Sequence, residues 1–225
     1  MKNQERTIVY CWFDTEYTDL DYNKAELLQV ALVVTDESLR PIGSPPEGIP
    51  KGLLTRDGFL AHIKSPPKSR ISQHVLDNYQ ELLARCASEG TDLGDVDRYL
   101  ALYLQQFPES GAEKVRARPV LAGNSIHADF FLAKKYLPQF AELLNYRLLD
   151  VSSQKLEWKH HYRGDKFKKK GNPKLIRKYY LGDDPVEGDK HDAYYDVQAS
   201  LAELAYYRSQ LKRAPNGRKS ERHSS

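Results

Sequence analysis

Two acidic residues near the start of the chain have the types and spacing of a metal-binding pair. The stretch YCWFDTEYTDLD places Asp14 and Glu16 at the end of an apolar run. Residues two apart on a strand point to the same face, so the two carboxylates can share one small volume. Like charges this close raise each other's pKa unless a cation lies between them, and oxygen-only clusters suit Mg²⁺ or Mn²⁺. Alone, the pattern is more typical of a solvated strand end.

Three further residues could complete such a site. In LAGNSIHADFFL, Asp129 follows a strand and a turn and falls in the first turn of a helix, where the helix dipole alone also favours a carboxylate. In KHDAYYD, five residues of helix would turn through about 140° net, so His191 and Asp196 would diverge if both were helical. We therefore expect His191 on a loop, Asp192 as the N-cap and Asp196 in the first turns of the helix. An ordinary loop histidine is the alternative for His191.

The elements that must position these residues predict an α/β fold with a mixed central sheet flanked by helices. Apolar and β-branched runs predict strands, and apolar residues at helical spacing predict helices. The predicted strands cover residues 7–14, 27–35, 58–64, 118–124 and 146–152, and the predicted helices cover 72–87, 93–107, a segment ending near Pro138 and 197–211. We expect one domain over residues 1–212 and a disordered basic tail over 213–225.

Composition is that of a soluble globular protein, with 40% hydrophobic and 29% charged residues. No apolar stretch approaches the ~20 residues that span a bilayer, and the N-terminus lacks a signal-peptide core. We expect a cytoplasmic protein with no membrane partner. Cys11 and Cys86 have neither disulfide-framework density nor zinc-ligand spacing, which predicts reduced core residues.

Positive charge is concentrated in one segment although the whole chain carries only +3. Between Lys155 and Lys178 there are ten Lys or Arg residues and two acids, Glu157 and Asp165. Two interpretations are open for this segment. It could be a solvated, flexible surface loop or a surface that binds phosphates.

Taken together, FDTE, GNSIHADFFL and HDAYYD resemble the three motifs of the DEDD-type 3′–5′ exonucleases, in the same order. The H-x4-D spacing resembles the histidine-type branch, and within it the chain is most similar to the oligoribonuclease family, over most of residues 7–210. The resemblance implies an RNase H-like fold, a homodimer, and a 3′–5′ exoribonuclease that degrades very short single-stranded RNA to 5′-mononucleotides.

The motif residues suit a two-metal hydrolysis. Asp14, Glu16, Asp129 and Asp196 would hold two divalent cations, Mg²⁺ or Mn²⁺, roughly 4 Å apart. One cation would prepare the attacking water and the other would stabilise the leaving 3′-oxygen. His191 would accept the proton of the water as general base.

Nine residues are candidates for binding substrate: Thr15, Tyr17, Leu20, Tyr79, Asn124, Ser125, Tyr146, Arg147 and Ser152. By resemblance, Leu20 is the wedge that separates two bases. Ser125, Tyr146, Arg147 and Ser152 resemble the group that caps a 5′ phosphate, and the guanidinium of Arg147 suits that role. In a homodimer, Tyr146 and Arg147 would reach the partner's site. Packing is the alternative for Leu20 and Tyr146.

The chain departs from the oligoribonuclease pattern at several positions. Tyr79 and Ala84 stand where the family carries a tryptophan and a histidine, Gln29 replaces a second-strand glutamate, and Asp19 replaces a glycine. The basic stretch 159–178 is longer than the usual connection. Tyr79 can still stack on a base, since an aromatic ring can stack on the face of any base. These changes leave the candidate metal site whole and leave the preferred substrate length open.

Two alternative functions therefore remain at this point. One is a related histidine-type exonuclease that acts on longer single-stranded RNA or DNA. The other is a non-catalytic nucleic-acid-binding protein of the same fold. The presence of all five catalytic residue types argues against the second alternative.

Overall fold

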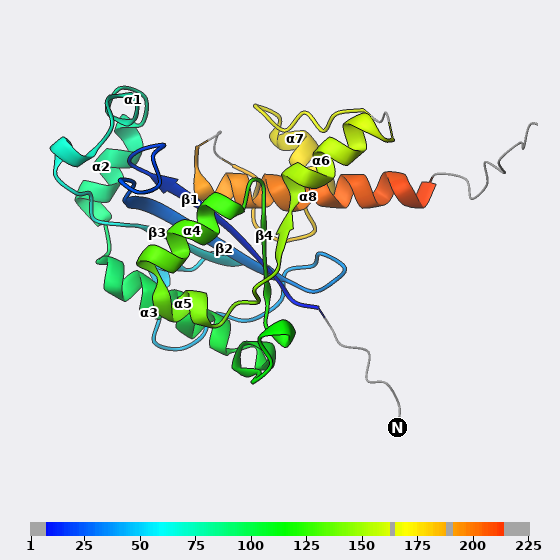
Figure 1. Ribbon diagram of the computed structural model, residues 1–225, viewed down its shortest axis with the longest axis horizontal. Coiled ribbons are helices and arrows are strands. Elements are labelled where there is room, and N and C mark those ends of the chain that lie inside the picture. Colours follow the sequence, from blue (N-terminus) through cyan, green and yellow to red (C-terminus); the bar gives the residue numbers. More distant parts are fainter. Residues whose placement is uncertain (1–7, 163–164, 188–190, 214–225) are drawn as a thin grey trace, which may run out of the picture.

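Five strands form one mixed sheet in the order β3-β2-β1-β4-β5 (Figure 1). The structure is a computed structural model that describes residues 8–162, 165–187 and 191–213. The strands are β1 (Tyr10–Tyr17), β2 (Leu27–Thr35), β3 (Gly58–His62), β4 (Val120–Gly123) and β5 (Leu148–Asp150). β1 pairs antiparallel with β2 and parallel with β4, so the predicted mixed sheet is confirmed.

Helices cover both faces of this sheet (Figure 1). One layer contains α3 (Leu93–Gln105), α4 (His127–Tyr136) and α5 (Pro138–Glu142), and the other contains α6 (Val151–His160), α7 (Pro173–Tyr179) and α8 (Ala193–Arg213). The short helices α1 (Gln73–Asn78) and α2 (Gln80–Glu89) pack near β2, and 3-10 turns occur at Lys51–Leu53, Lys68–Arg70, Pro108–Gly111 and Val115–Ala117.

The alternation of side chains along β1 determines what each layer contains. Cys11 and Phe13 are buried in the core with α3 to α5, whereas Trp12 is buried in the core with α8. The same alternation directs Asp14 and Glu16 toward α8. The pairing of β1 with β2 shifts register immediately after Glu16, so regular strand geometry extends as far as the second carboxylate.

Three of the differences between predicted and observed boundaries have a clear physical reason. The first strand extends to Tyr17 rather than ending at residue 14, because β2 continues to pair with it. The predicted helix 72–87 is two helices, because Tyr79 adopts φ −123° and ψ 36° and interrupts the turn. The last predicted strand ends at Asp150, whose side chain accepts a hydrogen bond from the Ser152 amide and thereby caps α6.

The two ends of the basic segment are helical, in α6 and α7, so the segment is not one continuous surface loop. Phe167, Ile176 and Tyr180 bury their side chains in the core with α8. Residues 163–164 lie outside the described residues, as do residues 214–225 of the predicted tail, so the domain limits and the tail stay predictions.

The two cysteines agree with the sequence prediction. Cys11 and Cys86 are both buried and both free thiols. Burial raises the pKa of each thiol above its ordinary value. Within the described part of the chain, no helix combines the length and apolarity that a membrane crossing requires.

Two buried carboxylates fasten the segment between α7 and α8 to the turn before β3. Asp57 accepts hydrogen bonds from the Tyr180 hydroxyl (2.6 Å) and the Asp184 amide (2.8 Å). Asp184 in turn accepts from the Asp57 amide (3.0 Å) and the Tyr194 hydroxyl (2.5 Å). Because hydrogen bonds to ionised groups are among the strong ones, this reciprocal network fixes the point from which the chain enters α8.

Replacing Asp57 by alanine tests this anchor. Asp57→Ala leaves the Tyr180 hydroxyl and the Asp184 amide without their acceptor, so we expect the free energy of unfolding in urea to fall by about 3 kcal/mol. Asp183→Ala, at an exposed neighbouring position, is the matched control and should change it by less than about 0.5 kcal/mol. Equal effects of the two substitutions would contradict an anchoring role for Asp57.

Candidate active site

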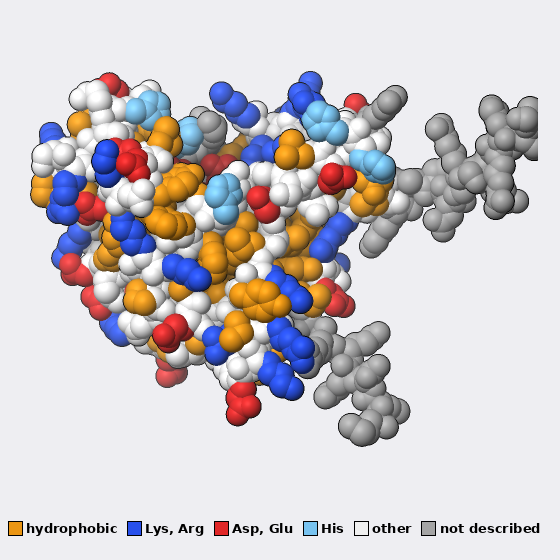
Figure 2. Space-filling model, viewed as in Figure 1, with side chains coloured by type: hydrophobic (Ala, Val, Ile, Leu, Met, Phe, Trp, Pro, Cys, Tyr) orange, Lys and Arg blue, Asp and Glu red, His pale blue; other side chains and the backbone are white. Residues whose placement is uncertain are grey.

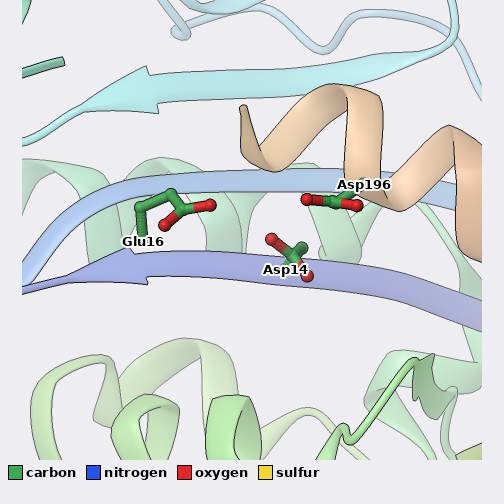
Figure 3. A group of neighbouring side chains, drawn as sticks. All are labelled: Asp14, Glu16 and Asp196. Carbon is green, nitrogen blue, oxygen red and sulfur yellow. The ribbon is translucent and has the colours of Figure 1, made fainter. Parts of the chain in front are cut away.

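Three carboxylates from two elements meet at the end of β1. Asp14 and Glu16 project from β1 toward Asp196 on α8 (Figure 3). Each offers an oxygen that lies within 4.8 Å of those of the other two. Asp192 accepts hydrogen bonds from the amides of Tyr194 (3.0 Å) and Tyr195 (3.1 Å), so it caps α8 as predicted. The cap places Asp196 in the first turn of α8, where the helix dipole favours a negative charge.

Asp129 reaches the same region from the first turn of α4. Its side chain is buried, and its Oδ1 accepts a 2.6 Å hydrogen bond from the Thr15 hydroxyl. Thr15 stands between Asp14 and Glu16 but faces the opposite side of β1, which is how it meets α4. The structure therefore brings together all four acids that the sequence indicated.

Burial and mutual repulsion make this cluster unfavourable as a group of bare carboxylates. Desolvation raises the pKa of Asp14 well above its ordinary value, and Asp129, Asp196 and Glu16 raise it further. Burial also raises the pKa of Asp129 to about 7, against the lowering effect of its Thr15 hydrogen bond. A divalent cation would relieve this repulsion, and a donor set made only of carboxylate oxygens suits Mg²⁺ or Mn²⁺.

His191 lies on the loop before α8, as predicted, and faces the same cleft. Its backbone has φ +77°, in the left-handed region, and its amide donates to Asp196 Oδ2 over 3.2 Å. Its ring lies 4.9 Å from the ring of Tyr79, measured between centroids. The break between α1 and α2 thus brings Tyr79 beside the candidate base, and Tyr79 and His191 line a cleft of about 260 Å³.

Gln29 fastens the start of α8 to the sheet. Its Oε1 accepts a 2.9 Å hydrogen bond from the Ala193 amide, and its Nε2 lies 3.0 Å from Nε2 of His62. The side chain is almost completely buried. A neutral amide can accept from Ala193 and contact His62 together without adding a fifth buried negative charge near the cluster. This contact gives a structural reason for the Gln29 departure seen in the sequence.

Most of the predicted substrate-binding residues line the cleft or support its wall. Those on the wall are Thr15, Tyr17, Leu20, Tyr79, Asn124 and Ser125. Leu20 is 79% exposed at this wall, so its side chain is not part of the hydrophobic core. Ser152 lies behind Ser125 and donates to Asn124 Oδ1 over 3.2 Å, while its Oγ accepts from the Ser125 amide over 3.0 Å.

Tyr146 and Arg147 lie away from this cleft in the single chain. Both side chains are exposed, and the guanidinium of Arg147 stacks 5.2 Å from the centre of the Tyr146 ring. Among the described residues they line two other surface hollows. The structure therefore does not bring these two predicted residues to the candidate site within one chain.

Sequence reasoning missed several residues of the site. Ser72 and His74, before and within α1, and Tyr22 also line the cleft. Lys169, from the connection between α6 and α7, places its Nζ 3.8 Å from Asp196 Oδ1. Nothing in the run KFKKK distinguishes Lys169 from its neighbours, because only the folded connection shows which lysine turns inward.

Comparison with known proteins identifies relatives over most of the chain. No protein-family model matches. A probable oligoribonuclease of Schizosaccharomyces pombe is 28% identical over 215 residues, covering 93% of this chain and 70% of the relative. An oligoribonuclease of Tropheryma whipplei is 29% identical over 206 residues, covering 88% of this chain and 90% of the relative.

Solved structures share the fold. S. pombe Pop2p, in its Mg²⁺- and Mn²⁺-bound form, superposes with a TM-score of 0.58 at 10% identity, covering 92% of this chain and 86% of that chain. E. coli exonuclease I in complex with an oligonucleotide superposes with a TM-score of 0.56 at 14% identity. The match covers 92% of this chain and 42% of that longer chain. The RNase H-like exonuclease fold is thereby confirmed. Over most of its length the chain is similar in sequence to the oligoribonucleases, and this similarity supports a nuclease, an enzyme that hydrolyses phosphodiester bonds.

Proposed function

We propose that this protein is a 3′–5′ exoribonuclease that degrades RNA of two to a few nucleotides and releases 5′-mononucleotides. The observation that carries the proposal is the partly buried group Asp14, Glu16 and Asp196, with Asp129 beside it, lining a cleft of about 260 Å³. That volume lies just below the roughly 300–1,000 Å³ of typical small-molecule sites, which suits a substrate of few nucleotides. The similarity to the oligoribonucleases supports the same substrate class.

Asp14, Glu16, Asp129 and Asp196 are the residues that would hold divalent cations, and we propose two per site. When bound, the cations supply Lewis-acid stabilisation of the charge that develops on the phosphate and on the leaving 3′-oxygen. The fit rests on the donor set, since Asp14, Glu16 and Asp196 bring carboxylate oxygens within 4.8 Å of one another, and on the raised pKa of Asp14, to which burial contributes most and the other three acids next. That Pop2p was solved with Mg²⁺ and Mn²⁺ supports the choice of ion.

In the proposed reaction, His191 accepts a proton from the water that attacks the terminal phosphodiester. The water oxygen forms a bond to phosphorus, the bond from phosphorus to the 3′-oxygen breaks, and solvent protonates that oxygen. The products are a 5′-mononucleotide and a strand one nucleotide shorter with a free 3′-hydroxyl. The hydrogen bond from the His191 amide to Asp196 couples the position of the base to the carboxylate cluster.

The remaining cleft residues would select the substrate. Leu20, exposed at the cleft wall, would separate the two bases, and the ring of Tyr79 would stack on one of them. Ser125 and Ser152, joined by hydrogen bonds, would bind the 5′ phosphate. In a homodimer, Tyr146 and Arg147 would complete this phosphate site from the partner subunit, which would account for their position away from the cleft of their own chain.

The runner-up is an exonuclease for longer single-stranded RNA or DNA. A specific observation favours it. In the basic segment, helix α6 carries Trp158, Lys155 and Lys159. The ring of Trp158 stacks on that of the exposed Tyr162, with 5.7 Å between ring centres. Basic side chains interleaved with aromatic rings are typical of surfaces that bind single strands. Exonuclease I, which shares the fold, was solved with an oligonucleotide.

The pH dependence of stability tests the electrostatics of the site. Without metal, the folded protein retains a proton on Asp129 from about pH 4 to its pKa of about 7, whereas the unfolded chain loses that proton near its ordinary pKa of about 4. This group therefore lowers stability as pH rises through that window. In EDTA, we expect Asp14→Asn to raise the free energy of unfolding by about 1–2 kcal/mol at pH 7.5, and by much less at pH 4.5.

Glu113→Gln, at an exposed position, is the control for loss of one carboxylate and should show no such pH dependence. Added Mn²⁺ should stabilise the wild type more at pH 7.5 than at pH 4.5, because ligands must be ionised. A destabilising effect of Asp14→Asn in EDTA at pH 7.5 would contradict the repulsive cluster.

Digestion of 5′-labelled RNAs from two to about ten nucleotides long tests the substrate class. With Mg²⁺ or Mn²⁺ present, we expect cleavage to be fastest for the dinucleotide, because the cleft that the four acids line is small, about 260 Å³. His191→Ala should lower kcat by at least about 100-fold while the melting temperature stays near that of the wild type. Rates that rise steadily with length would support the runner-up, and RNA binding without cleavage would revive the non-catalytic alternative.

A further inference from the structure

Lys169 is the residue of the basic segment that turns into the candidate active site. Its side chain is 23% exposed, and its Nζ lies 3.8 Å from Asp196 Oδ1 and 3.9 Å from Glu203 Oε2. Both distances exceed the 2.7–3.2 Å of a typical hydrogen bond to nitrogen. The ammonium is therefore close enough to act on both carboxylates electrostatically, yet it is not tied to either by a short bond.

The backbone of Lys169 is held in place by residues next to the catalytic acids. Its carbonyl accepts hydrogen bonds from the hydroxyl of Tyr195 and from the amide of Asn172, both at 3.1 Å. Tyr195 is buried and directly precedes Asp196 on α8. Two residues earlier, Phe167 is buried and packs on Tyr206, with 5.4 Å between ring centres. The direction of the Lys169 side chain is thus built into the folded segment.

Glu203 does not explain why this lysine is there. Its carboxylate, fully buried, pairs with Lys155 Nζ at 3.0 Å and accepts from the Tyr207 hydroxyl at 2.6 Å. Asn124 Nδ2 donates to it at 3.2 Å. Because three closer groups already neutralise and hydrogen-bond Glu203, the positive charge of Lys169 serves mainly the carboxylate cluster beside it. It also lowers the pKa of Asp14, against the other influences on that group.

The neighbouring lysines behave differently. Lys168 and Lys170 are exposed and carry the same charge on the same connection. In the face shown in Figure 2, Lys and Arg side chains project into solvent along the edge formed by α6, α7 and their connection. Lys169 therefore differs from them in placement rather than in chemistry, and they serve as matched controls.

We propose that Lys169 is a catalytic residue whose ammonium donates a hydrogen bond to a non-bridging oxygen of the phosphate that is cleaved. This inference rests on the proposed function, since it assigns a further contact to the same reaction. A phosphate that reaches the cluster is an anion beside four acids, and a preorganised cation there offsets that repulsion. The ammonium of a lysine stands at the end of a flexible side chain, so it can shift from the gap between Asp196 and Glu203 toward the substrate. The amine transfers no proton in this role.

The variant Lys169→Gln tests the proposal, with Lys168→Gln and Lys170→Gln as controls. On short RNA we expect Lys169→Gln to lower kcat about 100-fold, the typical effect of removing one donor to a developing charge. We expect both controls to stay within about twofold of the wild type. Lys169→Arg, which keeps the charge, should recover a measurable part of the lost rate.

A binding measurement gives a readout that does not depend on turnover. The probe is a dinucleotide whose bridging 3′-oxygen is replaced by a methylene group, titrated by calorimetry with Mg²⁺ present at several salt concentrations. Lys169→Gln should weaken binding by about tenfold and reduce the slope of log Kd against log salt by about 0.7, the contribution of one phosphate contact on a single strand.

The alternative outcomes are distinct. If Lys169→Gln lowers only the melting temperature and leaves probe affinity, salt slope and kcat unchanged, Lys169 is structural and the proposal is wrong. If Lys168→Gln or Lys170→Gln weakens binding as much as Lys169→Gln, the effect comes from the total positive charge of the segment rather than from one contact, and the proposal is equally wrong. A wild type that binds the probe but cleaves no RNA would refute the proposed function, while the comparison of probe affinities would still decide the contact of Lys169.

Discussion

Asp14, Glu16 and Asp196, with Asp129 beside them, repel one another in one partly buried cleft, and the rest of the architecture opposes that repulsion. Water would screen the repulsion between these carboxylates fully only if the side chains moved apart into solvent. The pKa of Asp14 is raised by burial first and then by Asp129, Asp196 and Glu16, which lie close enough to repel it. Divalent cations are the partners that make this arrangement favourable.

Three elements, β1, α4 and α8, hold the four acids. β1 fixes Asp14 and Glu16 through its pairing with β2, and Thr15 on the opposite face fixes Asp129. α8 brings Asp196, and the start of that helix is tied to the sheet by Gln29 and to the preceding segment by the network of Asp57 and Asp184. Because these anchors lie in separate elements, the cluster forms only when the whole domain has folded.

Local pattern predicted the parts of the site that depend on local structure. The alternation of β1 and the N-cap at Asp192 follow from residue type and spacing, and both are found in the structure. The break at Tyr79 could not be predicted in this way, because the apolar period continues through it. Lys169 is equally invisible in a run of lysines, since its direction is set by the distant Tyr195 and by the burial of Phe167.

Titration of Mn²⁺ into metal-free protein by calorimetry, in two buffers of different ionisation enthalpy, tests the carboxylate cluster most directly. At pH 6.5, below the pKa of about 7 of Asp129, binding of the ions should release protons, so the apparent enthalpy should depend on the buffer. The account predicts two ions per chain for the wild type and weaker binding for Asp196→Asn. Equal Mn²⁺ affinity in the two proteins, or binding without proton release, would contradict it.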